Sequence, residues 1–166
     1  MPEPEAYAYT DGASVGSRGP GGYGVVVTWR EKTEEFSAGE AETTNQRMEI
    51  VAACVALEAI DEGHQVTVYS DSSYLINCMR RRWHERWLAN GWISTLGNPV
   101  ANRDLWERLL AAVARHHEVR WKKVKGHRKT MGPHKAGNDR ADELAVAAKR
   151  SVTGVDRTVS VPEAGL

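Results

Sequence analysis

The chain has 166 residues, 41% hydrophobic and 27% charged, and its 22 basic and 22 acidic residues give a formal net charge of zero. These values are typical of one soluble globular domain and exclude a disordered chain, and the absence of any run of eighteen apolar residues argues against a membrane span. The N-terminus lacks the basic flank and apolar stretch of a signal peptide, and Cys54 and Cys78 are typical of free buried thiols, so we expect a cytoplasmic protein.

The first half of the chain is predicted to form three strands and a helix. The strands cover residues 5–10, 23–29 and 33–39, and the glycine-rich segment GASVGSRGPGG connects the first two. This segment lacks the Lys-Ser/Thr ending of a phosphate-binding loop and leads into a strand, which favours a hairpin connection. A helix is predicted over residues 43–60, because a capping-box pattern begins at Thr43 and apolar residues recur at helical spacing. Those apolar residues are Ile50, Ala53, Cys54, Leu57 and Ile60.

The second half alternates strands with helices. We expect strands over residues 65–70 and 118–124, and helices over residues 73–82, 102–116 and 138–149. A tryptophan-rich connection reaches Gly97. The order of elements indicates an α/β fold with helices packed on a mixed sheet. We assign residues 1–150 to one domain and residues 151–166 to a flexible C-terminal tail.

Four carboxylates flank the predicted core. Asp11 and Asp71 stand at strand ends, where ligands of open α/β sheets bind. Glu49 lies about 100° around its helix from Ile50, at the edge of the buried stripe, and Asp142 bears the same relation to the last helix. Clustered carboxylates repel one another, and oxygen ligands favour magnesium or manganese over zinc. Taken singly, each residue also fits a simpler role, which is an N-cap for Asp71 and a helix N-terminal charge for the two helical residues.

Basic residues concentrate in two segments although the net charge is zero. Residues 120–135 hold seven Lys or Arg and no Asp or Glu, while residues 31–42 hold five Glu and one Lys. This asymmetry can steer a polyanion to one face of the molecule. In a second cluster, Arg80–Arg82 and Arg86 alternate with tryptophans, a pattern that suits nucleic acid and equally fits a solvated helix face with inward tryptophans.

The motifs together resemble type 1 ribonuclease H, the family that cleaves the RNA strand of RNA–DNA hybrids. They occur in the family's order, and together they make the resemblance highly specific from about Tyr7 to Lys149. The matching segments are YTDGA at 9–13, GPGGYG at 19–24, TTNQRMEI at 43–50, YSDSSY at 69–74, DLW at 104–106, VKGH at 124–127 and NDRADELA at 138–145. The resemblance implies a ribonuclease H-like fold, with a five-stranded sheet of three antiparallel and two parallel strands flanked by helices.

By position, the resemblance assigns the family's four metal-binding carboxylates to Asp11, Glu49, Asp71 and Asp142. The ADELA match selects Asp142 over the nearby Asp139. The implied cofactor is a pair of Mg²⁺ ions, with Mn²⁺ as a possible substitute. Two such ions can activate a water and stabilise the leaving oxygen of a phosphodiester.

The resemblance also implies a loop histidine and a set of substrate contacts. His127 matches the histidine that assists proton transfer and product departure, although the following stretch is longer than in many relatives and contains a competing His134. A surface histidine that touches phosphate is the alternative for His127. The implied contacts to the RNA 2′-hydroxyls are Gly12, Ala13, Asn45 and Gln46; those to DNA phosphate are Thr44 and Asn102; Asn138 is a further substrate-binding position.

The segment RRRWHERWLANGW resembles the family's basic, tryptophan-bearing handle. Leu88, Ala89 and Asn90 stand where bacterial relatives often carry Lys and Arg. We therefore expect hybrid binding to rely on Arg80–Arg82 and on residues 120–135. The handle's tryptophans are expected to be packing residues first.

The sequence predicts a magnesium-dependent endonuclease that acts on RNA–DNA hybrids and leaves 5′-phosphate and 3′-hydroxyl ends. We expect a monomer that does not associate with membranes. Three alternatives remain, which are a junction resolvase of the same fold, a catalytically silent hybrid-binding module, and a zinc protein. The zinc alternative would use His116, His117, His127 and His134 and lacks thiolate partners.

Overall fold

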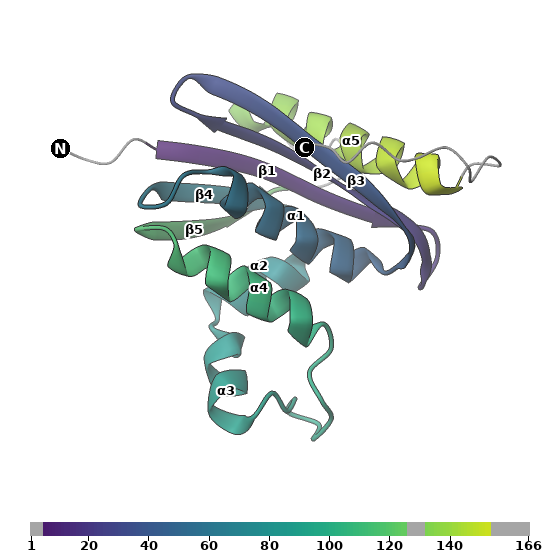
Figure 1. Ribbon diagram of the computed structural model, residues 1–166, viewed down its shortest axis with the longest axis vertical. Helices are drawn as coiled ribbons and strands as arrows, with labels where there is room; N and C mark the ends of the chain where they lie inside the picture. The colour runs from purple at the N-terminus through teal and green to yellow at the C-terminus, as the bar shows by residue number, and fades with distance from the viewer. Residues whose placement is uncertain (1–4, 126–131, 154–166) are drawn as a thin grey trace.

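The computed structural model describes residues 5–125 and 132–153, which form a five-stranded sheet with helices on both faces (Figure 1). The elements are β1 (Glu5–Ser14), β2 (Gly19–Trp29), β3 (Lys32–Thr43), α1 (Asn45–Ala59), β4 (Gln65–Ser70), α2 (Ser73–Arg80), α3 (Trp83–Asn90), α4 (Arg103–Ala114), β5 (Glu118–Lys123), a 3₁₀ turn (Gly132–His134) and α5 (Lys135–Thr153). Among these described helices, none has the length and apolar character needed to cross a bilayer.

The sheet has the strand order β3-β2-β1-β4-β5, with antiparallel pairing among β1–β3 and parallel pairing of β4 with β1 and with β5. The predicted mixed sheet is therefore confirmed. Pairing of β1 with β4 ends at Thr10, opposite Ser70, whereas β1 continues beside β2 as far as Ser14. The prediction that the first strand ends at residue 10 was therefore wrong, because pairing with β2 extends it by four residues.

Helix α1 is buried on more of its circumference than the sequence pattern predicted. All five residues of its predicted apolar stripe are fully buried, and the neighbouring Glu49 is only 3% exposed. The reason is that α1 contacts β1 and β2 on one side and α4 on another. The N-cap is Thr44, whose side chain accepts a hydrogen bond from the Arg47 amide, so the predicted capping box at Thr43 was displaced by one residue.

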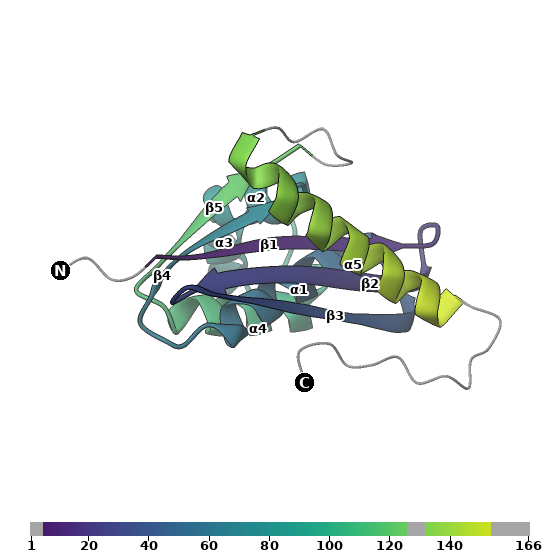
Figure 2. The same ribbon diagram turned by 90° about the horizontal axis from the view of Figure 1, so that it is seen from above.

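Helix α5 crosses β1, β2 and β3 on the face opposite α1 (Figure 2). Three glycines of β2 and β3 lie beneath it, namely Gly22, Gly24 and Gly39. A Cβ at Gly24 would overlap the backbone of Ala141 and Ala145, and one at Gly22 would lie 2.6 Å from the Lys149 amide nitrogen. The glycines of the predicted hairpin connection thus belong largely to β2. Among them Gly22, together with Gly24 further along the strand, lets the helix approach the sheet because it has no side chain.

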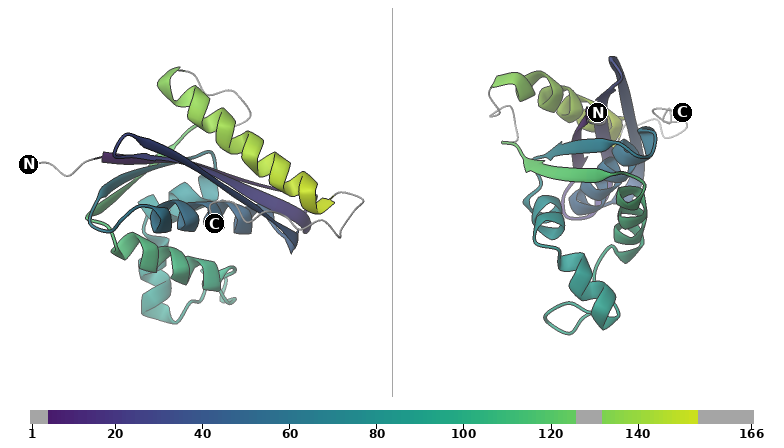
Figure 3. Two further views of the ribbon diagram at one scale, coloured as in Figure 1. Left: turned by 45° about the horizontal axis from the view of Figure 1, so that its top comes forward. Right: turned by 90° about the vertical axis from the view of Figure 1, so that its left-hand side faces the viewer.

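Helix α3 was not predicted, and α5 is longer than predicted. Helix α3 follows Arg82, which has a left-handed backbone, and none of its residues is buried. Figure 3 shows it projecting from the body away from α5. It is supported by tertiary packing of the Trp87 ring against Trp92 and Trp106, which no local pattern indicates. Helix α5 runs to Thr153, three residues into the segment predicted as a tail.

The close approach of α5 predicts a large effect from one added methyl group. Gly24→Ala should lower the free energy of unfolding by about 1–3 kcal/mol, because the new Cβ overlaps the α5 backbone. Chemical denaturation monitored by circular dichroism measures this value. Ser37→Ala, at the position paired with Gly24 on β3, adds no atom and serves as the control. Equal stability of Gly24→Ala and the wild type would contradict the packing argument.

Candidate active site

Asp11 and Asp71 lie side by side because of the β1–β4 register. The last pair of that parallel ladder joins Thr10 to Ser70, and each aspartate is the next residue along its own strand direction. Asp11 is buried, at 8% exposure, whereas Asp71 is half-buried. The two carboxylates therefore meet where the parallel pairing stops, at the carboxyl end of the strands.

The N-cap of α2 is Ser72, the residue after Asp71. Its side chain accepts a hydrogen bond of 3.1 Å from the Leu75 amide, and its own amide donates to Ser70 Oγ. The capping alternative for Asp71 is therefore wrong, because the neighbouring serine occupies that position. Asp71 instead joins the carboxylates of Asp11 and Glu49.

Glu49 reaches this point from α1, which lies directly against β1. A Cβ at Gly12 would sit 2.5 Å from the Glu49 amide nitrogen, so the two backbones can approach this closely only with glycine there. Ser70 Oγ lies 3.4 Å from Glu49 Oε2 and donates to it. The glycine beside Asp11 thus sets the distance between strand and helix that brings the two carboxylates together.

The three carboxylates repel one another strongly. One ligand oxygen from each of Asp11, Glu49 and Asp71 lies within 4.8 Å of the other two. Burial, the charge of Asp71 and a hydrogen bond with Asp142 raise the pKa of Asp11 to about 8. Burial and the charges of Asp11 and Asp71 raise the pKa of Glu49 well above its usual value. The cluster therefore favours protons or a cation over three bare negative charges.

The cluster forms the floor of an open hollow of about 640 Å³. Asp142 lines this hollow from α5, completing the set of four carboxylates, whereas Asp139 pairs with Lys135 and does not line it. The residues that line the hollow are Asp11, Gly12, Ala13, Ser14, Asn45, Gln46, Glu49, Asp71, Ser72, Ser73, Tyr74, Asp142, Val146 and Lys149. Four of the predicted substrate-binding residues are thus beside the carboxylates.

The donor set fits a hard divalent cation. All side-chain groups of the cluster offer carboxylate oxygens, which suit Mg²⁺ or Mn²⁺ and not zinc. Within the described ranges, this is the one group of acidic, Cys or His side chains close enough to share an ion. His116 does not join such a group, since its Nε2 donates to the Leu57 carbonyl oxygen at 2.8 Å.

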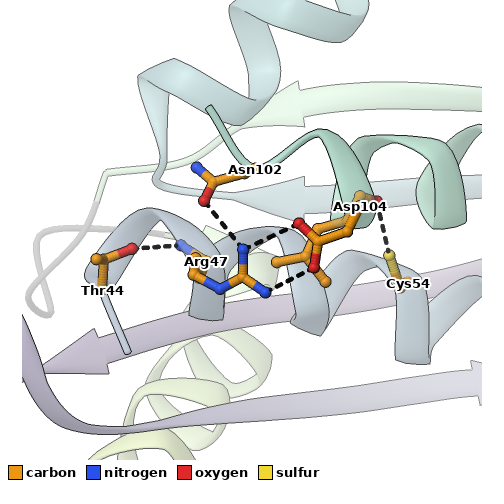
Figure 4. A network of polar contacts seen from close by, with 6 residues as sticks. Thr44, Arg47, Cys54, Asn102 and Asp104 are labelled. Atoms are coloured by element: carbon orange, nitrogen blue, oxygen red, sulfur yellow. Dashed lines mark hydrogen bonds and ion pairs between the residues drawn. The ribbon is translucent and has the colours of Figure 1, made fainter. Parts of the chain in front are cut away.

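Two further predicted residues, Thr44 and Asn102, lie in a separate polar network outside the hollow (Figure 4). Arg47 Nη1 donates to Asn102 Oδ1 at 3.2 Å, and the same guanidinium donates twice to Asp104, at 3.1 and 2.8 Å. This interaction lowers the pKa of Asp104. Because arginine can only donate, the Asn102 oxygen must face it and the Nδ2 donors point away.

Asn102 also departs from the usual role of an asparagine at a helix start. It is the N-cap residue of α4 with a left-handed backbone (φ 63°), and its side chain forms no capping hydrogen bond within the described part of the chain. Thr44 caps α1 nearby in the same network. The N-termini of two helices therefore accompany the Arg47 guanidinium, an arrangement that attracts anions.

His134 and Asn138 lie near the start of α5. His134 packs against Tyr69, with ring centroids 4.4 Å apart, and its Nδ1 lies 3.0 Å from the Tyr9 hydroxyl. Asn138 is buried and donates to the Lys125 carbonyl oxygen, and it does not line the hollow. His127 lies outside the described residues.

The sequence predictions missed two charged residues near the predicted contacts. Lys149 lines the hollow, and its spacing of seven residues from Asp142 was the signal that could have indicated it. Arg47 bonds both Thr44 and Asn102, two of the predicted substrate contacts. Its hydrogen bond to Asn102 joins residues that are 55 apart in sequence. No local pattern predicts a contact of that kind.

Comparisons with known proteins agree with the fold and identify the family. The RNase H family profile matches residues 3–150. Ribonuclease H of Moorella thermoacetica is 50% identical over 144 residues, 87% of this chain and 91% of the relative. Ribonuclease H of Symbiobacterium thermophilum is 47% identical over 144 residues, 87% of this chain and 94% of the relative.

Solved structures agree with the fold. LC9-RNase H1, a type 1 RNase H with the type 2 active-site motif, has a TM-score of 0.75 and 28% identity, covering 99% of this chain and 80% of its own. LC11-RNase H1, solved in complex with RNA/DNA hybrid, has a TM-score of 0.65 and 24% identity, covering 90% of this chain and 99% of its own. On the strength of the profile match and the close relatives, the chain belongs to the ribonuclease H family, a family of endoribonucleases.

Proposed function

We propose that this ribonuclease H hydrolyses the RNA strand of RNA–DNA hybrids, leaving 5′-phosphate and 3′-hydroxyl ends. The observation that carries the proposal is the convergence of Asp11, Glu49 and Asp71 within 4.8 Å at the floor of an open hollow. The family profile match over residues 3–150 supports the same reaction. The relative solved with an RNA/DNA hybrid supports the substrate class.

The carboxylates would hold two divalent cations, Mg²⁺ or Mn²⁺. Asp11 and Asp71 are proposed as the central ligands, and Glu49 and Asp142 would complete the two sites; Asp11 interacts with each of the other three carboxylates. When bound, such ions supply a nucleophilic water at neutral pH and neutralise charge on the leaving oxygen. The chain itself supplies fixed positions for the four ligands, because Asp11, Glu49 and Asp142 are carried by β1, α1 and α5, and Asp71 lies in the two-residue link between β4 and α2.

Recognition of the RNA strand is proposed for the floor and walls of the hollow. Beyond Thr10, one backbone edge of β1 is no longer paired with β4, and Gly12 and Ala13 line the hollow there. Asn45 and Gln46 line it from the start of α1. Backbone and amide groups of this kind can bond the 2′-hydroxyls that distinguish RNA from DNA.

The DNA strand is proposed to contact the network around Arg47. Thr44 and the outward Nδ2 of Asn102 offer donors to a phosphate, and Arg47 adds positive charge. Arg80–Arg82 are exposed at the junction of α2 and α3 and are proposed to add further phosphate contacts. The role of His127, the cytoplasmic location and the monomeric state stay predictions.

A catalytically silent hybrid-binding protein is the alternative that the following experiment distinguishes. The wild-type protein with Mg²⁺ should cleave an end-labelled RNA–DNA hybrid and leave single-stranded RNA and double-stranded RNA intact. Asp71→Asn and Asp142→Asn should each lower the cleavage rate by roughly 10³-fold, because each removes a cation ligand worth several kcal/mol in the transition state. Gel-resolved cleavage rates measure this effect.

Asp139→Asn is the matched control, since it removes one charge from the same helix outside the hollow. Its cleavage rate should stay within about twofold of the wild type, because Asp139 does not line the hollow that holds the four carboxylates. Hybrid binding without cleavage by the wild type, in Mg²⁺ and in Mn²⁺, would favour the silent binding protein. Equal losses in Asp139→Asn and Asp142→Asn would count against the ligand assignment.

The raised pKa of Asp11 predicts a pH dependence of stability in the metal-free protein. The folded state holds the Asp11 proton up to about pH 8, whereas the unfolded chain releases it near its ordinary pKa of 3.8. Between these values the folded state binds more protons, so this contribution to stability decreases as the pH rises. Asp11→Asn removes the titrating carboxyl group and its repulsion with the other carboxylates. At pH 8 in EDTA it should raise the melting temperature by a few degrees, which corresponds to about 1 kcal/mol or more in the free energy of unfolding.

Melting curves from pH 5 to 8, with and without Mg²⁺, measure this difference. The comparison must be between variant and wild type, because burial lowers the pKa of His116 and gives stability the opposite slope below pH 6.5. Mg²⁺ should raise the melting temperature of the wild type and have a smaller effect on Asp11→Asn. A less stable Asp11→Asn in EDTA would refute the repulsion argument.

The Arg47 network predicts effects on substrate binding that are not additive. Arg47→Gln and Asp104→Asn should each raise KM roughly fivefold with kcat unchanged, because both release the Asn102 amide from its fixed orientation. In an Asn102→Ala background, Asp104→Asn should change KM little further. In the same background, Arg47→Gln should raise KM only by the amount due to the lost arginine charge. Steady-state kinetics on a defined hybrid measure these values.

Arg108→Gln is a matched control for this network. Arg108 makes a similar two-bond pair with Glu58, at 2.9 and 2.6 Å, and this pair also joins α4 to α1. The Arg108→Gln variant should lose as much stability as Arg47→Gln, and its KM should stay unchanged. Fully additive effects of Asp104→Asn and Asn102→Ala on KM would show that Asp104 does not act through Asn102.

A further inference from the structure

Lys149 shares one face of α5 with the fourth carboxylate of the active site. Asp142, Val146 and Lys149 all line the hollow, and their spacing of four and three residues places them in one row along the helix. Lys149 is the one Lys or Arg among the described residues that line this hollow. It therefore introduces a positive charge into a site whose other charged groups are acidic.

The packing of α5 fixes where along the hollow this charge lies. The Lys149 amide nitrogen is 2.6 Å from the position that a Cβ on Gly22 would take, and Gly22 pairs with Ala13 on β1. Lys149 is thus held one strand away from Ala13, at the end of the hollow toward Ser14. Seven residues of helix place it about 10 Å along the axis from Asp142.

This distance separates the role of Lys149 from that of the carboxylates. Successive phosphates of one strand are spaced by about 3.4 Å along a duplex axis, so about 10 Å corresponds to two or three nucleotides. The RNA strand is the one proposed to lie over Gly12 and Ala13. A cation beside Ala13 is therefore placed to meet an RNA phosphate that is not the one being cleaved.

We propose that Lys149 binds a phosphate of the RNA strand two or three nucleotides from the cleaved bond, on the Ala13 side of the hollow. This inference rests on the proposed function, because it assumes that the RNA strand occupies the hollow. The contact fixes the position of the strand along β1 and carries no base preference. The alternative role for Lys149 is to reduce the repulsion among the four carboxylates.

Binding in EDTA tests the proposal without relying on catalysis. Lys149→Met should weaken the affinity for an RNA–DNA hybrid roughly fivefold near 0.1 M salt, and should reduce the slope of log Kd against log salt by about one. Lys149→Arg should restore both values. Lys32→Met is the matched control, because Lys32 is exposed at the β2–β3 turn, at the far end of β2 from Gly22.

A single methylphosphonate, which has no charge, can then be moved along the RNA strand one phosphate at a time. At one position, two or three nucleotides from the cleavage site, the wild type should lose affinity and Lys149→Met should not. Unchanged affinity and salt slope in Lys149→Met would overturn the proposal. So would an unchanged slope with a higher Mg²⁺ requirement for cleavage, which would assign Lys149 to the carboxylates. A wild type that binds the hybrid with the predicted Lys149 dependence but does not cleave it would refute the proposed activity and leave this contact standing.

Discussion

The parallel register of β1 and β4 is the constraint on which the site depends. The paired register ends with Thr10 opposite Ser70, and the next residues are Asp11 and Asp71. The register therefore places these two carboxylates next to each other. Backbone hydrogen bonds hold this register, and a shift by one residue would turn one of the two side chains to the other face. The repulsion between Asp11 and Asp71 is thus opposed by the whole β1–β4 ladder.

Missing side chains place the other two carboxylates. Gly12 lets α1 lie against β1, which brings Glu49 to Asp11, and Gly22 and Gly24 let α5 lie against β2, which brings Asp142 over the same point. The two helices lie on opposite faces of the sheet and reach one site because each lies close to a strand. The glycines allow this close approach. They also lower the strand propensity, and packing in the surrounding core compensates for that loss.

Helix capping and ligand binding are divided between adjacent residues. Ser72 caps α2 while Asp71 joins the carboxylates, and Thr44 caps α1 while its neighbours Asn45 and Gln46 line the hollow. An unpaired helix terminus would compete for the same oxygens that a cation needs. Because hydroxyl groups supply the caps, the oxygens of the carboxylates stay available to a cation. The raised pKa of Asp11 reflects the burial and mutual repulsion of these carboxylates, which a cation would relieve.

The sequence by itself determined the order and approximate positions of the five strands, the apolar stripe of α1 and the choice of four candidate carboxylates. Helical and strand periodicity are local, and the ribonuclease H motifs surround each acidic residue within a few positions. The tertiary structure alone decided how deeply Glu49 is buried, that residues 83–90 form a helix, and that Arg47 holds Asn102. It also decided that Lys149 lies in the same hollow as Asp11. Each of these depends on contacts between residues far apart in the chain, and a local pattern carries no information about the distance between two such residues.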